Sequence, residues 1–194
     1  MKKILVAIVT LTLVFALSAC GGQKEKKDAG NKKTEIKTLK SKNGHITVKN
    51  YLKGYKVTIS SSDDMIEIMA KDKDDPSKLD NGKFVNFKTV DKDGKFFGLK
   101  TWLKSFEDGS DYTIETLKSD LEAYCNENPN IIRNPTDVKL GGYDYVRVEG
   151  TINAEDGYHY YGIVNNKPVR IEVAGIRDDK KANKTMESVK WNLK

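Results

Sequence analysis

Residues 137–176 read DVKLGGYDYVRVEGTINAEDGYHYYGIVNNKPVRIEVAGI, and this stretch decides the fold. Apolar and polar residues alternate in three long runs, which is the period of half-buried β-strands. Turn-forming residues separate the runs, namely Gly141-Gly142, Glu155-Asp156-Gly157 and Asn165-Asn166. The stretch therefore predicts a three-strand antiparallel meander at 143–152, 158–164 and 168–176, entered through residues 137–140.

The first strand of this meander carries the most distinctive side chains of the chain. By period 2, Tyr143, Tyr145, Arg147 and Glu149 share one face, and the expected register brings Tyr160 alongside them. Tyrosine and arginine are enriched in binding hot spots, so Tyr143, Tyr145, Arg147 and Tyr160 are the candidate partner-binding residues. The opposite face then forms the core and consists of Val146, Val148, Ile152 and Ile163. The alternative is that a helix covers the tyrosine face, with Arg147 and Glu149 in cross-strand pairs.

The chain before and after the meander supplies further strands and two helices. Strands are expected at 45–49, 55–60, 83–90 and 96–103, a strand or short helix at 65–70, and a polar loop at 72–82. Leu117, Leu121 and Cys125 repeat with the helical period within 113–126. A last helix begins after Asp178 or Asp179. The fold class is therefore α+β: an antiparallel sheet of about six strands, one central amphipathic helix, and a C-terminal helix packed on the sheet.

A few positions in this order of elements resemble a known superfamily. They are Gly142, Tyr143, Tyr145, Val146 and Trp191, which lie in a Gly-Gly-Tyr strand start and behind the C-terminal helix. The pattern over 44–194 resembles the superfamily of the photosystem extrinsic protein PsbP. The resemblance implies an antiparallel sheet sandwiched between helices and an accessory or binding role, mostly without catalysis. It transfers no functional residue.

The N-terminus carries a targeting signal. Lys2 and Lys3 precede an uncharged stretch at 4–19, which is shorter than the roughly 20 residues of a spanning helix. Leu17-Ser18-Ala19-Cys20 ends this stretch and resembles the lipobox of bacterial lipoprotein precursors. The resemblance implies cleavage after Ala19 and acylation of Cys20, for example with palmitate. It places the protein on the outer side of the cytoplasmic membrane, in a cell that composition suggests is Gram-positive. The alternatives are an ordinary secretory signal or an uncleaved membrane helix.

Positive charge is concentrated beside this anchor. The chain of 194 residues has a net charge of +6, and residues 21–43 hold eight lysines against three acidic residues. Residues 20–43 are therefore expected to form a disordered Lys-rich tether on anionic lipid or wall polymer, or simply a solvated linker. The domain at 44–194 has no excess of basic residues, which argues against nucleic acid.

The sequence holds no recognised catalytic or cofactor motif. Walker loops, Rossmann glycine runs, HExxH and CxxC motifs and nucleophile elbows are absent. His45 and His159 are isolated, Cys125 is expected to be a buried thiol, and the aspartates at 72–80 lack the pattern of a calcium loop. We expect no cofactor, no metal and a non-enzymatic domain that binds an unidentified protein or envelope polymer. The alternative is a small-ligand receptor or a carboxylate-based cell-envelope enzyme.

Replacing the lipobox cysteine tests the anchor. Stable membrane attachment needs two acyl chains or an equivalent second signal, which a diacylated Cys20 supplies. The Cys20→Ala protein is expected in the medium or as uncleaved precursor when cell fractions are compared by immunoblotting. Mature-size Cys20→Ala protein in the membrane fraction would refute the lipoprotein interpretation.

Overall fold

The computed structural model describes residues 36–62, 64–89 and 113–194. The signal sequence, Cys20, most of the tether and the strand predicted at 96–103 lie outside these ranges. The strands are β1 (Lys37–Lys40), β2 (Ile46–Asn50), β3 (Lys56–Ile59), β4 (Met65–Lys71), β5 (Leu79–Thr89), β6 (Ile132–Leu140), β7 (Tyr143–Ile152), β8 (Glu155–Val164), β9 (Lys167–Ala174) and β10 (Lys190–Trp191). The helices are α2 (Ile114–Glu127) and α3 (Lys180–Glu187).

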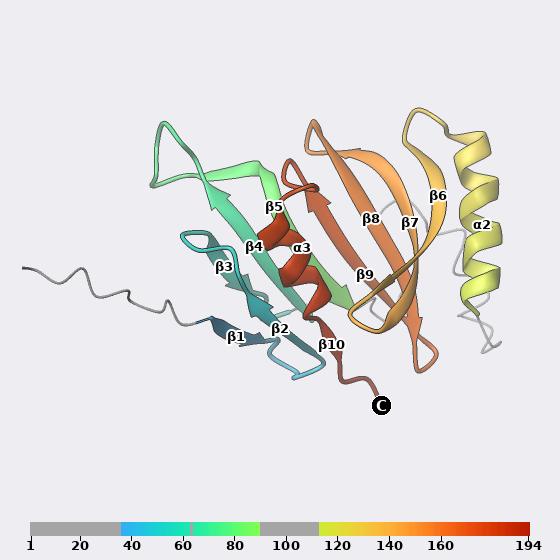
Figure 1. The fold of residues 1–194 in the computed structure, drawn as a ribbon, viewed down its shortest axis with the longest axis horizontal. Coiled ribbons are helices and arrows are strands. Elements are labelled where there is room, and N and C mark those ends of the chain that lie inside the picture. Colours follow the sequence, from blue (N-terminus) through green and yellow to red (C-terminus); the bar gives the residue numbers. More distant parts are fainter. Residues whose placement is uncertain (1–35, 63, 90–112) are drawn as a thin grey trace, which may run out of the picture. The chain divides into compact units, whose positions relative to one another are not determined.

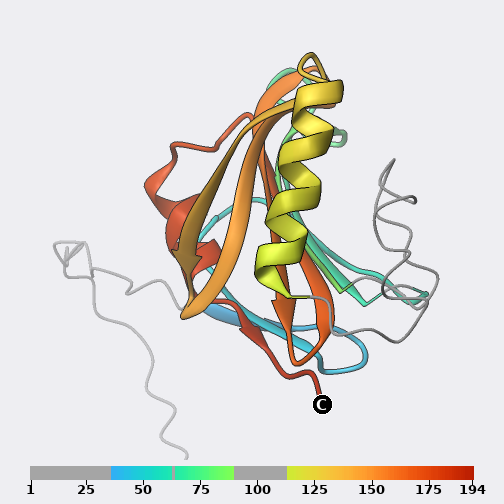
Figure 2. The same cartoon turned by 90° about the vertical axis from the view of Figure 1, so that its right-hand side faces the viewer.

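The main element is an antiparallel sheet in the order β3-β4-β5-β9-β8-β7-β6. A smaller sheet, β1-β2-β10, lies with α3 on one face, and α2 covers part of the other face (Figures 1 and 2). The α+β class is thus confirmed, and the main sheet has seven strands where about six were expected. The meander is confirmed as β7-β8-β9, with β6 as a full fourth strand.

The turn between β7 and β8 differs from the prediction. It is formed by Asn153 and Ala154, whose φ angles are +51° and +68°, and not by residues 155–157. Gly157 lies inside β8, where an added Cβ would sit 2.6 Å from the Val173 carbonyl oxygen. This glycine is therefore needed for close approach of two strands and does not form a turn. The next turn is Asn165-Asn166, as predicted.

Two boundaries also move, and the segment left open between strand and short helix is a strand. The domain was expected to begin at residue 44, but β1 already pairs with β2 and Leu39 packs against the core. Backbone hydrogen bonding explains the difference, because it needs no apolar composition. The segment at 65–70 is a strand, since both its neighbours β3 and β5 pair with it. The polar loop expected to reach residue 82 ends earlier, because β5 begins at Leu79.

Helix α2 forms where the sequence predicts it. The Thr113 hydroxyl caps it by accepting a hydrogen bond from the Thr116 amide at 3.2 Å. Leu117, Leu121 and Cys125 are buried against the sheet. Helix α3 is capped by Asp179, which accepts from two backbone amides, and ends at Glu187, slightly before the expected Val189.

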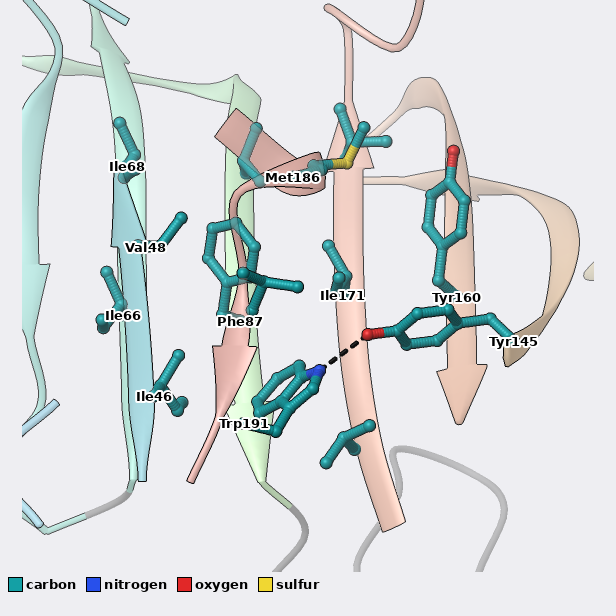
Figure 3. Packing of buried hydrophobic residues seen from close by; sticks show 14 of the residues in the cluster. Ile46, Val48, Ile66, Ile68, Phe87, Tyr145, Tyr160, Ile171, Met186 and Trp191 are labelled. Carbon is teal, nitrogen blue, oxygen red and sulfur yellow. Dashed lines mark hydrogen bonds between the residues drawn. The ribbon is translucent and has the colours of Figure 1, made fainter. Parts of the chain in front are cut away.

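The main core lies between the sheet and the layer formed by α3, β2 and β10. Phe87 and Ile171 project from the sheet and Met186 from α3 (Figure 3), and Val85 and Val173 belong to the same buried cluster. Phe84 is buried on the opposite face of the sheet. The reason is that residues three apart on a strand point to opposite sides.

A buried hydrogen bond closes this core. Trp191 Nε1 donates to the Tyr145 hydroxyl at 2.6 Å, and both residues are almost wholly buried (Figure 3). Burial raises the pKa of the Tyr145 hydroxyl, so it stays neutral at physiological pH. The bond connects β10, near the C-terminus, with β7, which comes much earlier in the sequence.

Removing the tyrosine hydroxyl tests this closure. Tyr145→Phe leaves the indole N–H without an acceptor in a dry core, which should cost about 1–3 kcal/mol of unfolding free energy in urea titrations. Tyr158→Phe is the matched control, because it keeps a half-buried ring on β8, and should change stability by less than about 0.5 kcal/mol. Equal stabilities of the two variants would contradict the role of the bond.

Candidate functional site

The tyrosine face predicted to bind a partner is part of the core. The predicted register is present, because Arg147 pairs directly with Tyr160. However, Tyr145 is 1% exposed and Tyr160 is 7% exposed. The partner-binding prediction for these two residues is therefore wrong. The layer formed by α3 and β10 covers them, which is the alternative raised from the sequence.

The other two predicted residues also act within the fold. The Tyr143 hydroxyl accepts a hydrogen bond from the Trp191 amide at 3.2 Å. The Arg147 guanidinium lies over the Tyr158 ring, 4.5 Å from its centre. Glu149 pairs with Arg133 on β6 at 3.6 Å. These contacts leave the face without the shape of an open docking patch.

The opposite face of the sheet carries a row of polar side chains on four adjacent strands. Glu67 on β4 pairs with Asn86 on β5, Asn86 pairs with Glu172 on β9, and Glu172 pairs with His159 on β8. Directly paired residues have Cβ atoms about 5 Å apart and point to the same side. We call these four residues the polar row.

Two further rows flank the polar row. One contains Met65, Lys88, Arg170 and Tyr161, and the other contains Met69, Phe84, Ala174 and Gly157. The polar row therefore lies between a mixed charged row and an apolar row. A ligand bound on this face would contact charged side chains at the centre and apolar side chains on one side.

A pocket of about 730 Å³ lies over these rows. Tyr124 of α2 and the segments at 131–132 and 151–153 form its walls. The described residues that line it are Met65, Glu67, Phe84, Asn86, Lys88, Tyr124, Ile131, Ile132, Thr151, Ile152, Asn153, His159, Tyr161, Arg170 and Glu172. The volume falls in the range of about 300–1,000 Å³ that is typical of small-molecule sites.

Glu172 is the centre of the charge network in the floor of this pocket. Arg170 Nη2 lies 2.9 Å from Glu172 Oε2, and His159 Nδ1 lies 3.1 Å from Oε1. Burial opposes the negative charge, but His159 and Arg170 hold the pKa of Glu172 below its usual range. The His159 ring also stacks on Tyr161, with ring centres 5.9 Å apart. Glu172 is thus ionised and already neutralised by the protein.

The other half of the polar row is not neutralised in this way. Burial, and then the negative charge of Glu172, raise the pKa of Glu67, and no described residue forms an ion pair with it. Asn86 Nδ2 donates to Met65 Sδ at 3.4 Å. Within the described ranges, no group donates to Asn86 Oδ1, although this atom is buried. Among the described residues, Asn86 Oδ1 and the Glu67 carboxylate thus have no donor, and His159 Nδ1, although 3.1 Å from Glu172 Oε1, has no partner with hydrogen-bond geometry.

The remaining sequence candidates have local structural partners. His45 Nδ1 lies 2.8 Å from Asp64 Oδ2. In the 72–80 loop, Asp72 accepts from the amides of Asp74 and Asp75, and Asp80 pairs with Lys83. Among the described residues, no group of three His, Cys, Asp or Glu side chains could hold a metal ion. The described helices also include none long and apolar enough to cross a membrane.

Comparisons with known proteins reach only the level of fold. No family model and no curated protein matches the chain. The chain is similar to the solution structure of cyanobacterial PsbP (CyanoP) from Synechocystis sp. PCC 6803, with 10% identity and a TM-score of 0.43 over 90% of this chain and 98% of that one. It is also similar to a crystal structure from Bacteroides thetaiotaomicron VPI-5482, with 12% identity and a TM-score of 0.41 over 83% of this chain. The chain spans half the length of the Bacteroides protein. A PsbP-like protein is thus among its structural neighbours at low identity.

The polar row was missed from the sequence, although one signal was present. Arg170 and Glu172 alternate with Val169, Ile171 and Val173 in the last strand of the predicted meander. Charged side chains are costly to bury if a second layer covers their face of the strand, so they indicate either a paired cluster or a ligand site. His159 was considered only as an isolated histidine.

Replacing Glu172 tests the charge network. Glu172→Gln leaves Arg170 buried without its carboxylate and should cost about 3–5 kcal/mol of unfolding free energy at pH 7. Because the folded-state pKa of Glu172 is lowered, its stabilisation is present above the unfolded pKa of about 4.3 and is lost as pH falls. The difference between wild type and variant should therefore shrink by pH 3.5 in urea titrations.

The matched control for this measurement is Glu122→Gln on the exposed side of α2. It should change stability by less than about 0.5 kcal/mol at either pH. If Glu172→Gln is as stable as this control at pH 7, the network does not hold the site together. The same conclusion follows if its deficit is equal at both pH values.

Proposed function

We propose that this protein is a membrane-anchored bacterial lipoprotein whose domain binds a small molecule in the pocket over the polar row. One observation carries the binding proposal: charged and polar side chains from four adjacent strands meet in the floor of a cavity of about 730 Å³. The domain has a non-enzymatic binding role, and the small-ligand alternative raised from the sequence is preferred to a protein-docking surface.

The energetics of the polar row support binding over a purely structural role. If this face of the sheet were only a packing surface, apolar side chains would cost less free energy to bury than these polar ones. The opposite face is built mainly from apolar residues. Here Glu67 is half-buried at a cost, since burial and Glu172 both oppose its ionisation. Perturbed carboxyl groups in a concave, partly apolar pocket are typical of ligand sites.

The sequence supports the location of this function. Residues 1–20 resemble a lipoprotein signal with acylation at Cys20, and the lysines of 21–43 are attracted to anionic surfaces at about 1 kcal/mol each. We propose that the domain is held on the outer side of the cytoplasmic membrane. Its tether contacts anionic lipid or wall polymer, and a protein partner of this domain is still to be identified.

A second function uses the same pocket. Glu67 has the raised pKa expected of a general acid, which favours a carboxylate-based enzyme of the cell envelope. The described lining of the pocket contains no Ser or Cys beside His159 that would define a nucleophilic reaction. We therefore rank this enzyme below a receptor.

A neutral fluorescent dye tests whether the pocket accepts a small molecule. N-phenyl-1-naphthylamine should gain fluorescence with saturation on binding to the mature domain. Ile152 is half-buried and packs over Gly157 on the pocket side of the sheet, so Ile152→Trp should fill the pocket and weaken binding at least tenfold. Thr38→Trp, on β1 and outside the pocket lining, is the matched control and should bind as the wild type does.

Two results would contradict the receptor proposal. One is saturable dye binding of equal affinity in Ile152→Trp and Thr38→Trp, which would place the dye elsewhere. The other is the absence of saturable binding to the wild-type domain. Melting temperatures of both variants within about 4 °C of the wild type would establish that the folds are retained, since 1 kcal/mol shifts a domain of this size by about 2–4 °C.

A further inference from the structure

We propose that the ligand of this pocket carries a protonated amine on an apolar body, and that Glu67 and Asn86 Oδ1 bind the amine. This inference rests on the proposed receptor function and adds the chemical class of the ligand. It follows from which polar atoms of the polar row already have partners and which do not. Three features of the molecule support it, namely Asn86, Glu67 and the walls of the pocket.

Asn86 supplies the first indication because it is buried and incompletely hydrogen-bonded. The residue is 9% exposed, and Oδ1 has no donor among the described residues. Its Nδ2 group faces Met65 Sδ, a weak acceptor, which orients the amide with the oxygen free. An amide oxygen buried without a donor is costly, so the pocket is suited to receive a hydrogen-bond donor.

Glu67 supplies the second indication and the sign of the charge. It pairs directly with Asn86, so the two side chains lie next to each other on the same face. Glu172 is already neutralised by Arg170 and His159, whereas Glu67 has no ion-pair partner in the described part of the chain. A cation placed beside Glu67 would offset both the burial and the repulsion from Glu172. A primary ammonium group offers three donors, enough for Glu67 and Asn86 together.

The pocket walls favour an organic cation over a metal ion. The flanking apolar row presents Phe84, and Ile152 and Tyr124 line the same cavity. A cavity of about 730 Å³ is far larger than a bare ion needs, and its described residues offer Glu67 as the one carboxylate not already paired. Calcium requires six to eight oxygen ligands, which two side chains cannot provide.

Lys88 marks the competing possibility of an anionic ligand. It lies in the row next to Asn86 and Glu67 and lines the same pocket. A carboxylate bound to Lys88 would leave Asn86 Oδ1 without a donor and would approach Glu67 unfavourably. An anionic probe therefore discriminates between binding at Lys88 and binding at Glu67 and Asn86.

Three probes with the same phenyl body test the inference on the mature domain at pH 7. They are 2-phenylethylamine (cation), 2-phenylethanol (neutral) and 3-phenylpropionate (anion), each titrated by calorimetry. The amine should bind at least tenfold more tightly than either of the others. Glu67→Gln should reduce amine affinity at least tenfold and leave the alcohol within about twofold. Glu122→Gln is the matched control and should leave all three affinities unchanged.

The outcomes separate this inference from the receptor function. If the alcohol or the acid binds as tightly as the amine and Ile152→Trp abolishes that binding, the amine class is wrong and the receptor function stands. Amine binding that survives both Glu67→Gln and Ile152→Trp would place the amine outside the pocket and overturn the inference. If no probe binds and the dye does not bind either, both proposals fail. Calcium binding that depends on Glu67, without amine binding, also overturns the amine class.

Discussion

The alternation of side chains along β9 is the constraint on which both layers of the domain depend. Val169, Ile171 and Val173 point into the main core, while Arg170 and Glu172 point into the pocket. The neighbouring strands β5 and β8 repeat this division because direct pairing fixes their faces. A slip of one residue would exchange the two sets and bury charge in the main core. The short turn at Asn165-Asn166 holds β8 and β9 in the register that prevents this.

The same register that builds the core therefore assembles the site. The polar row spans four strands, of which β4 and β5 precede α2 in the chain and β8 and β9 follow it. The row forms only where β5 pairs with β9, in the middle of the sheet. Its charges are arranged unequally: Glu172 is held between Arg170 and His159, whereas Glu67 has no such partner among the described residues. Arg170, His159 and Glu172 thus form the paired half of the site, and Glu67 and Asn86 form the half to which we assign the ligand.

Much of the fold could be predicted from local patterns, and the site could not. The meander, helix α2 and the α+β class follow from periodicity, and Arg147 does pair with Tyr160 as expected. Periodicity divides a strand into two faces without saying which is covered, so Tyr145 and Tyr160 were assigned to the wrong environment. The turn at Asn153-Ala154 was missed because alanine rarely adopts a φ of +68°. The polar row depends on pairing between segments far apart in the sequence, which no local pattern encodes.

The most direct test of this account is the ionisation of Glu67, followed by carbon-13 NMR of its carboxyl group during a pH titration. In the free domain its midpoint should lie above about 4.3, the ordinary value of a glutamate carboxyl, because burial and Glu172 raise the pKa of Glu67. Saturation with 2-phenylethylamine should lower the midpoint, since a bound ammonium group stabilises the carboxylate. A midpoint at the ordinary value that does not move when the amine is added would contradict a ligand site built around this residue.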